Sequence, residues 1–185
     1  MQEVEAVRDE NILKSIPVLL SKHSTQQMAD VWEFGINMAL RISDLLGIRY
    51  SDIKDGRLTM VESKTGKVAD IPLNAKALAI TKSIMKEYPE GEFLFQSRNS
   101  RNISTRIKPL SRQSVAKAFK DVGEIIGVKL GTHSMRKTRG RFLYAKTNDI
   151  ARVSKMLRHS STGVTLKYIG ITKSDIDADF NEMVL

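Results

Sequence analysis

Residues 133–168 read HSMRKTRGRFLYAKTNDIARVSKMLRHSSTGVTLKY. Their spacing predicts three short helices, at about 134–146, 149–158 and 161–169. His133 and Arg136 stand three residues apart at the start of the first helix, so both side chains lie on one face. Exposed N–H groups and the positive end of the helix dipole make such a start suitable for a phosphate. On its own, the pair indicates only a candidate anion site.

The same segment carries a second histidine and a tyrosine. His159 closes Leu157-Arg158-His159, and Tyr168 follows nine residues later. A single tyrosine in an amphipathic helix is more often a residue at the edge of the core than a nucleophile. Tyr168 therefore has to be interpreted together with the rest of the chain.

Helices are also predicted before this segment. Residues 9–22 form one helix, with Pro17 as an interior irregularity. Ser24 is expected to begin a second helix, with Gln27 three residues later completing a capping box. That helix leads to Arg41.

Arg41 lies between apolar residues. It follows Met38-Ala39-Leu40 and precedes Ile42, and a short helix then ends near Gly47. An arginine in such surroundings either extends its charged end to the surface or is held for a purpose.

A β-hairpin follows. Leu58–Glu62 and Val68–Leu73 read as short strands on either side of Ser63-Lys64-Thr65-Gly66-Lys67. Gly66 supplies the positive φ that a tight turn needs. Glu92–Phe95 is expected to form a third strand. The fold class is therefore mostly α with a small antiparallel β-sheet (α+β).

Three further helices and one loop complete the chain. Asn74 caps one helix, Ser111 caps another, and Ser174 caps a last one that runs to the C-terminus. The basic stretch 97–110 is expected to be a loop. The apolar residues expected to share one face of the helix after Ser111 are Val115, Phe119, Val122, Ile125 and Ile126.

Composition excludes several classes of protein. The chain has 185 residues, 41% of them hydrophobic, which fits one domain with a real core. Without cysteine it has no disulfides and no thiolate metal site, and three histidines do not favour a structural zinc site. No apolar run is long enough to cross a bilayer, and the start lacks a signal-peptide pattern. We expect a cytosolic protein with no cofactor and no membrane contact.

The positive charge is concentrated in one stretch. The net charge is +9, although both ends of the chain are acidic. In the middle of the chain lies a basic region that contains no acidic residue. We expect this region to contact DNA phosphates, since such charge density attracts a polyanion. A solvated basic surface is the alternative. The residues concerned are Arg98, Arg101, Arg106, Lys108, Arg112, Lys117 and Lys120.

Together, these motifs resemble the catalytic domain of the tyrosine recombinases, the phage-integrase family, from about residue 9 to 170. That family has an Arg after a helix, a Lys in a β-hairpin, a His-x-x-Arg box, a Leu-Gly-His box and a Tyr nine residues beyond its His. In this chain the elements fall on Arg41, Lys64, His133, Arg136, Leu157-Arg158-His159 and Tyr168.

Three positions depart from the family pattern. Ala39 stands where the family usually has Gly, Met135 replaces a Leu, and Arg158 replaces the Gly before the His. None of these changes removes a reacting group, and the additional charge of Arg158 has no assigned role. Lys67 is a rival to Lys64 for the hairpin lysine, although Ser-Lys-Thr-Gly is closer to the family pattern.

The resemblance implies cleavage and rejoining of double-stranded DNA without metal or ATP. Tyr168 would attack phosphorus and form a 3′-phosphotyrosyl link, which splits the exchange into two easier steps. Lys64 would protonate the departing 5′ oxygen. His133 would accept the tyrosine proton or position the phosphate.

The remaining groups would bind the phosphate. Arg41 and Arg136 would clamp its oxygens with paired donors, and His159 would add a hydrogen bond. The surrounding positive charge is also expected to make the Tyr168 phenolate easier to form.

Family members usually carry a further helical domain before the catalytic one, and here about eight residues precede the first helix. We therefore expect either an excised catalytic domain or a short member resembling the fimbrial-switch invertases. A homotetramer on DNA is expected. The helix over residues 171–185 would dock on a neighbouring protomer or pack on its own domain. The alternatives in function are a type IB topoisomerase and a catalytically silent DNA-binding module of the same fold.

Overall fold

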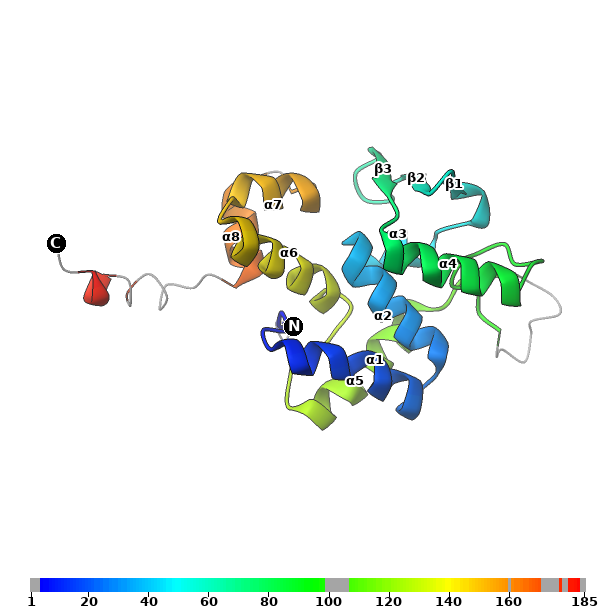
Figure 1. Cartoon of the computed structure of the whole chain (residues 1–185), viewed down its shortest axis with the longest axis horizontal. Helices are drawn as coiled ribbons and strands as arrows, with labels where there is room; N and C mark the ends of the chain where they lie inside the picture. Colours follow the sequence, from blue (N-terminus) through cyan, green and yellow to red (C-terminus); the bar gives the residue numbers. More distant parts are fainter. Residues whose placement is uncertain (1–3, 99–106, 160, 171–176, 178–179, 184–185) are drawn as a thin grey trace.

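The computed structural model describes residues 4–98, 107–159, 161–170, 177 and 180–183. Over these residues it confirms a mostly helical fold with a small antiparallel sheet (Figure 1). The elements are α1 (Glu10–His23), α2 (Gln26–Met38), α3 (Ile42–Leu46), the 3-10 turn η1 (Tyr50–Asp52), β1 (Ile53–Lys54), β2 (Arg57–Val61), β3 (Val68–Pro72), α4 (Ala75–Glu87), α5 (Arg112–Ile126), α6 (Ser134–Thr147), α7 (Ile150–Leu157) and α8 (Thr162–Ile169).

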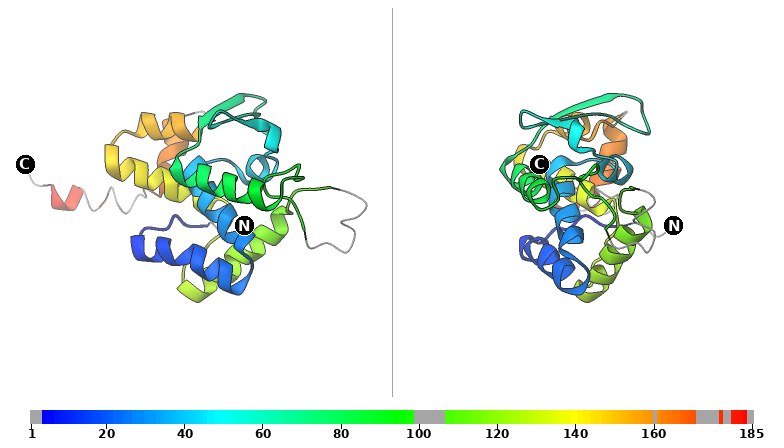
Figure 2. Two further views of the ribbon diagram at one scale, coloured as in Figure 1. Left: turned by 45° about the vertical axis from the view of Figure 1, so that its right-hand side comes forward. Right: turned by 90° about the vertical axis from the view of Figure 1, so that its right-hand side faces the viewer.

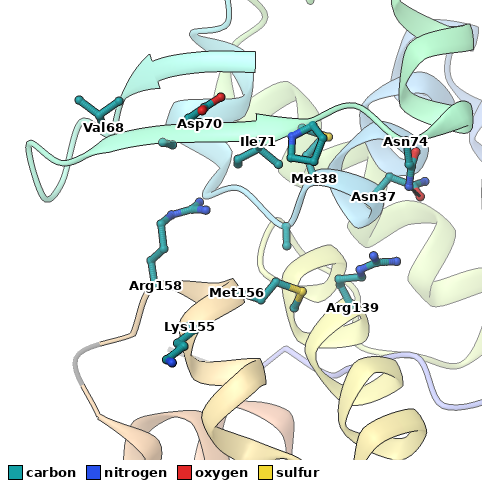
Figure 3. A pocket seen from close by; sticks show the side chains of 13 residues that line it. Asn37, Met38, Val68, Asp70, Ile71, Asn74, Arg139, Lys155, Met156 and Arg158 are labelled. Carbon is teal, nitrogen blue, oxygen red and sulfur yellow. Dashed lines mark hydrogen bonds between the residues drawn. The ribbon is translucent and has the colours of Figure 1, made fainter. Parts of the chain in front are cut away.

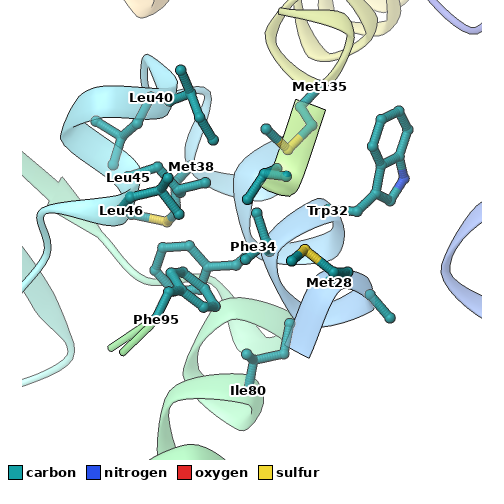
Figure 4. Close-up of a cluster of buried hydrophobic side chains, with 14 of the residues drawn as sticks. Met28, Trp32, Phe34, Met38, Leu40, Leu45, Leu46, Ile80, Phe95 and Met135 are labelled. Carbon is teal, nitrogen blue, oxygen red and sulfur yellow. The ribbon is translucent and has the colours of Figure 1, made fainter. Parts of the chain in front are cut away.

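Helix α2 lies at the centre of the main core. Trp32 packs edge-on against Phe119 of α5, and Phe34 packs edge-on against Phe95. Met135, at the start of α6, is fully buried in the same cluster (Figure 4). Burying these large side chains ties α2 to α5 and to the beginning of α6.

Two of the predicted helix caps are confirmed, one is wrong, and the one at Ser174 lies outside the described residues. Asn74 and Ser111 accept hydrogen bonds from the Ala77 and Ser114 amides at the starts of α4 and α5. The capping box expected at Ser24 is wrong. Thr25 caps α2 instead, because the Ser24 amide is already bonded to the Leu20 carbonyl as the end of α1.

The sheet has the order β1-β2-β3, all antiparallel. The β2–β3 hairpin forms as expected, and Gly66 has a φ of +65°. The third strand predicted at Glu92–Phe95 is wrong, since that segment forms only an isolated bridge through Phe93. The Gln96 side-chain oxygen accepts the Glu92 and Phe93 amides, so those amides do not join a ladder. The two-residue β1 is the third strand.

One residue of the face predicted for α5 points away from the core. Val115, Phe119 and Val122 are buried, but Ile125 is 53% exposed. At about 100° per residue, Ile125 lies about 80° from the line of the other apolar residues, whereas Ile126 returns to it.

Helices α6, α7 and α8 lie side by side at one end of the molecule (Figures 1 and 2). A second, smaller apolar cluster joins them to the end of α2 and contains Ala39, Val153, Leu157 and Ile169. The N-terminal segment also reaches this region. The Val7 amide donates to the Thr138 hydroxyl of α6 at 2.9 Å, and the Val7 side chain is buried.

Two predictions concern residues that the structure describes only in part. Most of the expected loop 97–110 and most of the expected helix at 171–185 lie outside the described residues. Within the residues that are described, no helix combines the length and the apolar character that crossing a bilayer requires.

Gly123 of α5 generates a prediction about stability. A Cβ at this position would lie 2.5 Å from the Val128 carbonyl oxygen and 3.0 Å from the Leu130 amide. Overpacking costs about 1–3 kcal/mol, more than the roughly 0.5–1 kcal/mol that alanine gains over glycine in a helix. Gly123→Ala should therefore lower the free energy of unfolding, measured in urea, by about 1–2 kcal/mol.

Gly163→Ala is the matched control. Gly163 lies in α8, and a Cβ there would meet no atom within 4 Å. Its free energy of unfolding should stay constant or rise by up to about 1 kcal/mol. Equal effects of the two substitutions would show that the close approach of the backbone at Gly123 does not destabilise the alanine variant.

Candidate active site

The Arg136 side chain connects three segments that are far apart in the sequence. It extends from the first turn of α6 and is only 2% exposed. Its guanidinium donates to the Ala39 carbonyl at 2.7 Å and to the Leu157 carbonyl. A guanidinium has five N–H groups, so these two bonds leave donors for another ligand. Burial lowers the pKa of Arg136 to about 10, and the group stays charged at neutral pH.

Two of the departures from the family pattern lie at left-handed backbone positions. Ala39 ends α2 with a φ of 52°, and Arg158 ends α7 with a φ of 50°. Glycine adopts this conformation without steric cost, whereas other residues pay about 1–2 kcal/mol. A helix end in this geometry explains why glycine suits both positions.

Arg41 lies at the start of α3, two residues after Ala39. Its guanidinium bonds to Glu62 of the hairpin at 3.1 Å, and its side chain is 18% exposed. Arg158 pairs with the other oxygen of the same carboxylate. Arg41 therefore lies in the site as predicted, and it is paired there with Glu62, an acid that the sequence motifs do not indicate.

Tyr168 faces two histidines of its own chain. Its hydroxyl lies 3.1 Å from Nδ1 of His133, and its ring packs edge-on against the His159 ring at 4.9 Å. The ammonium of Lys137 lies 5.6 Å from the centre of the Tyr168 ring. The structure thus brings together predicted residues that are up to 35 positions apart in the sequence.

The positive charge around Tyr168 lowers its pKa, as expected, but the phenolate does not form easily because burial outweighs that charge. Burial raises the pKa of Tyr168 to about 12, and the charges of Arg136 and Arg41 with a hydrogen bond from Arg136 only partly oppose it. Burial also lowers the pKa of His133, and the neighbouring charges of Arg112, Arg136, Lys137 and Arg41 lower it further. Tyr168 is therefore a protonated phenol beside a neutral imidazole that can accept its proton.

His159 is also neutral. Burial lowers its pKa to about 4, helped by the charges of Arg136 and Arg41. Its Nδ1 lies 3.0 Å from the Thr165 hydroxyl of α8. The Thr165 hydroxyl also donates to the Ser161 carbonyl at 3.2 Å. If that single proton turns toward Nδ1 instead, the His159 proton is on Nε2, which is then a donor for an anion.

Lys64 is the predicted residue that the structure does not bring into this cluster. Its side chain is exposed in the loop of the β2–β3 hairpin, as is that of its rival Lys67. The neighbouring Ser63 is fixed, because its amide and hydroxyl both donate to the buried carboxylate of Asp44, at 2.8 and 2.6 Å.

The basic residues predicted to contact DNA fall into four groups. Arg101 and Arg106 lie outside the described residues, and Arg98 stacks on the Tyr88 ring at 3.4 Å. Lys117 and Lys120 each pair with an acid one turn later in α5, which the acid-free stretch of sequence did not reveal. Lys108 is exposed, as is Arg112, whose charge acts on His133.

A cavity of about 1030 Å³ opens beside Tyr168. Its wall includes His133, Lys137 and Tyr168 together with Arg112 and Lys120 of α5. The nucleophile candidate and part of the predicted basic surface therefore line one concave space. Within the described part of the chain, no cluster of His, Asp or Glu suits a metal ion.

A second cavity, of about 490 Å³, lies between β3 and helices α6 and α7 (Figure 3). Arg139, Lys155 and Arg158 lie on its wall, and Arg158 extends from the end of α7 toward the hairpin. None of the predicted catalytic residues lines this cavity.

Sequence reasoning missed Glu62, Lys137 and Thr165. No signal marks Glu62, since residues 52–70 contain four acidic and four basic residues and one more acid there does not stand out. The roles of Lys137 and Thr165 depend on how α6 and α8 pack, and neither residue stands out by spacing.

Comparison with known proteins shows which family the chain is similar to. The model of the phage integrase family matches residues 10–175. The Bacillus subtilis protein named probable integrase/recombinase YoeC is 34% identical over 183 residues, which cover 97% of each chain. The tyrosine recombinase XerC of Caldanaerobacter subterraneus is 29% identical over 153 residues, 80% of this chain and 42% of that protein.

Solved structures share the fold. The XerA recombinase superposes with a TM-score of 0.71 at 15% identity, covering 98% of this chain and 65% of that one. A lambda integrase dimer bound to a COC′ core site gives 0.69 at 24% identity, covering 94% and 62%. The family match over most of the sequence, the relative of equal length and the shared fold lead to one conclusion: this chain belongs to the phage integrase family of tyrosine recombinases.

Proposed function

We propose that this protein is a site-specific recombinase that cleaves and rejoins double-stranded DNA through a 3′-phosphotyrosyl intermediate. The observation that carries the proposal is the 3.1 Å contact between the Tyr168 hydroxyl and Nδ1 of His133, among the charges of Arg41 and Arg136. The printed names of its relatives, integrase and tyrosine recombinase, support the same activity.

The proposed cleavage step balances without a metal or ATP. The Tyr168 oxygen forms a bond to phosphorus while its proton passes to Nδ1 of His133. The bond from phosphorus to the 5′ oxygen breaks, and Lys64 supplies a proton to that oxygen. The products are a 3′-phosphotyrosyl link and a 5′-hydroxyl. Attack by a 5′-hydroxyl of another strand reverses the step and joins the strands.

Charge develops on the phosphate oxygens in the transition state. Arg41 and the free N–H groups of Arg136 are proposed to bind two of these oxygens. Nε2 of His159 is proposed to make a third contact to the phosphate. Preorganised donors act strongly where water is excluded, and losing one typically costs about 3–4 kcal/mol. The two carbonyl bonds that fix Arg136 provide this preorganisation.

The nucleophile is proposed to act in cis. Tyr168 meets His133 and His159 of the same chain, so a complete set of these groups exists within one protomer. The proposal also includes a DNA surface formed by Arg98, Arg112 and the predicted basic residues around them. It further includes assembly as a homotetramer on DNA and docking of the 171–185 segment on a neighbouring protomer.

Tyr168→Phe should retain DNA binding and lose covalent linkage, because the phenolic oxygen is the attacking atom. The assay incubates the protein with a pool of nicked duplex oligonucleotides of random sequence and scores DNA that stays attached to protein in a denaturing gel. Tyr88→Phe is the control, since Tyr88 lies outside the site. DNA linked to Tyr168→Phe would assign the nucleophile to another residue.

The cleavage rate at saturating DNA should be constant above about pH 6.5 and should fall below it. The pKa of His133 lies below its ordinary value of 6.5, so the imidazole is neutral at pH 7 and stops accepting a proton as it becomes protonated at acid pH. His133→Gln should lower the plateau and remove this acid limb. An unchanged limb in His133→Gln would exclude His133 as the base.

Arg41→Lys should slow cleavage by about 10²–10³-fold while DNA affinity changes by less than about threefold. Lysine keeps the charge beside Glu62 but cannot offer paired donors to phosphate oxygens. Arg57→Lys is the matched control, because Arg57 also pairs with a carboxylate, Asp70, but on the exposed sheet. Near-normal cleavage by Arg41→Lys would contradict its role as a phosphate clamp.

A further inference from the structure

Glu62 is a buried acid that the proposed reaction does not use. It follows β2, two residues before Lys64, and its side chain is 0% exposed. One carboxylate oxygen accepts from Arg41 at 3.1 Å and from the Thr65 hydroxyl at 2.7 Å. The other oxygen accepts from Nε of Arg158. Both oxygens of the carboxylate are therefore bonded to groups of the site.

These contacts join three separate parts of the candidate active site. Arg41 belongs to the turn before α3, Arg158 to the turn that presents His159, and Thr65 to the loop that carries Lys64. A single carboxylate thus holds the hairpin against both turns. Hydrogen bonds to charged groups are among the stronger ones in proteins, and they hold geometry best where water is excluded.

The charge balance at this carboxylate is unusual. Two guanidinium groups share one buried acid, so the group of three carries a net positive charge. The hydrogen bonds from Thr65 and Arg158 and the two charges outweigh burial and keep the pKa of Glu62 below its ordinary value. Glu62 is ionised at neutral pH, and two arginines share its one negative charge.

Arg158 occupies a backbone position at which glycine would be less strained. Its φ is 50°, and an arginine there costs about 1–2 kcal/mol relative to glycine. Its Nη2 is buried without a hydrogen-bond partner among the described residues. The side chain extends from the end of α7 toward the hairpin (Figure 3), and its bond to Glu62 is the interaction that can offset this cost.

We propose that Glu62 and Arg158 form a coupled pair of positioning residues for Arg41. Arg158 occupies one oxygen of Glu62, so Arg41 is held through the other oxygen by a single N–H group. The remaining donors of Arg41 are then oriented by the pair and free for the DNA phosphate. This role rests on the proposed recombinase function.

The coupling predicts that the two single substitutions misplace Arg41 in different ways. In Arg158→Gly, Glu62 has only Arg41 to pair with, and a two-bond pair between them withdraws Arg41 from the phosphate. In Glu62→Gln, Arg41 and Arg158 lose their counter-charge and repel each other. The double variant removes both the competing acid and the extra base, and it restores glycine to the strained turn.

The test measures two quantities for each variant on the nicked duplex pool: the single-turnover rate of covalent linkage at saturating protein, and the dissociation constant for DNA. Each single substitution should reduce the rate at least tenfold, with the dissociation constant within about threefold of wild type. Glu62→Gln/Arg158→Gly should lose no more than the larger of the two single losses, because both substitutions act on Arg41 through the same carboxylate. Arg158→Lys should retain more activity than Arg158→Gly, because it keeps a charge for Glu62.

The control is the exposed pair of Arg57 and Asp70 in the same sheet, where Arg57→Gly, Asp70→Asn and their double variant should leave the linkage rate unchanged. Thermal unfolding of every variant separates lost folding from lost positioning. Additive rate losses in the double variant, unchanged rates in both single variants, or losses that follow only the fraction unfolded would each overturn the proposal.

A separate measurement distinguishes this inference from the proposed function. If the wild-type protein forms no covalent link to any DNA in the pool, the recombinase proposal fails. The pair is then judged from DNA-free protein, by the guanidinium ¹⁵N resonances of Arg41. A shift of these resonances in Arg158→Gly that the double variant reverses supports the coupling, and unchanged resonances refute it.

Discussion

The Arg136 side chain carries a charge that the protein interior would expel if it lacked hydrogen-bond partners. Its partners are two main-chain carbonyls, those of Ala39 and Leu157, at the ends of α2 and α7. Both helix ends must therefore meet the start of α6. Arg41 follows Ala39 by two residues and His159 follows Leu157 by two, so the same bonds bring the other phosphate-binding candidates to one place. The position of the site follows from the need to satisfy one buried guanidinium.

Burial and positive charge around this guanidinium act together on the two histidines and against each other on Tyr168. Both disfavour a protonated imidazole, so His133 and His159 are neutral. For the phenol of Tyr168, burial raises the pKa and the arginines lower it, and burial prevails. A site of this kind is deficient in negative charge, which a DNA phosphate would supply. Glu62 is the buried acid that keeps the arrangement ordered before such a ligand arrives.

The helices and most of the candidate site could be predicted because their signals are local. The spacings from His133 to Arg136 and from His159 to Tyr168 lie within short stretches of sequence, so they can be recognised without knowing how the helices pack. The errors arose where another contact competed. The Ser24 amide donates to the Leu20 carbonyl at the end of α1. The Gln96 side chain accepts the Glu92 and Phe93 amides, which a strand would use for pairing. The strand β1 was overlooked although Asp55-Gly56, both at positive φ, is a typical tight-turn pair. The contacts of Glu62 depend on three distant segments, and no spacing rule reports them.

The proton on Tyr168 also matters when no reaction is under way. With a pKa near 12, only roughly one molecule in a hundred thousand carries the reactive oxyanion at pH 7. A chromosome presents phosphodiesters at every step along its length, and a permanently ionised nucleophile would be a standing source of accidental nicks. Burial keeps this oxygen in its protonated form, so strand breakage would require a base such as His133 to take the proton.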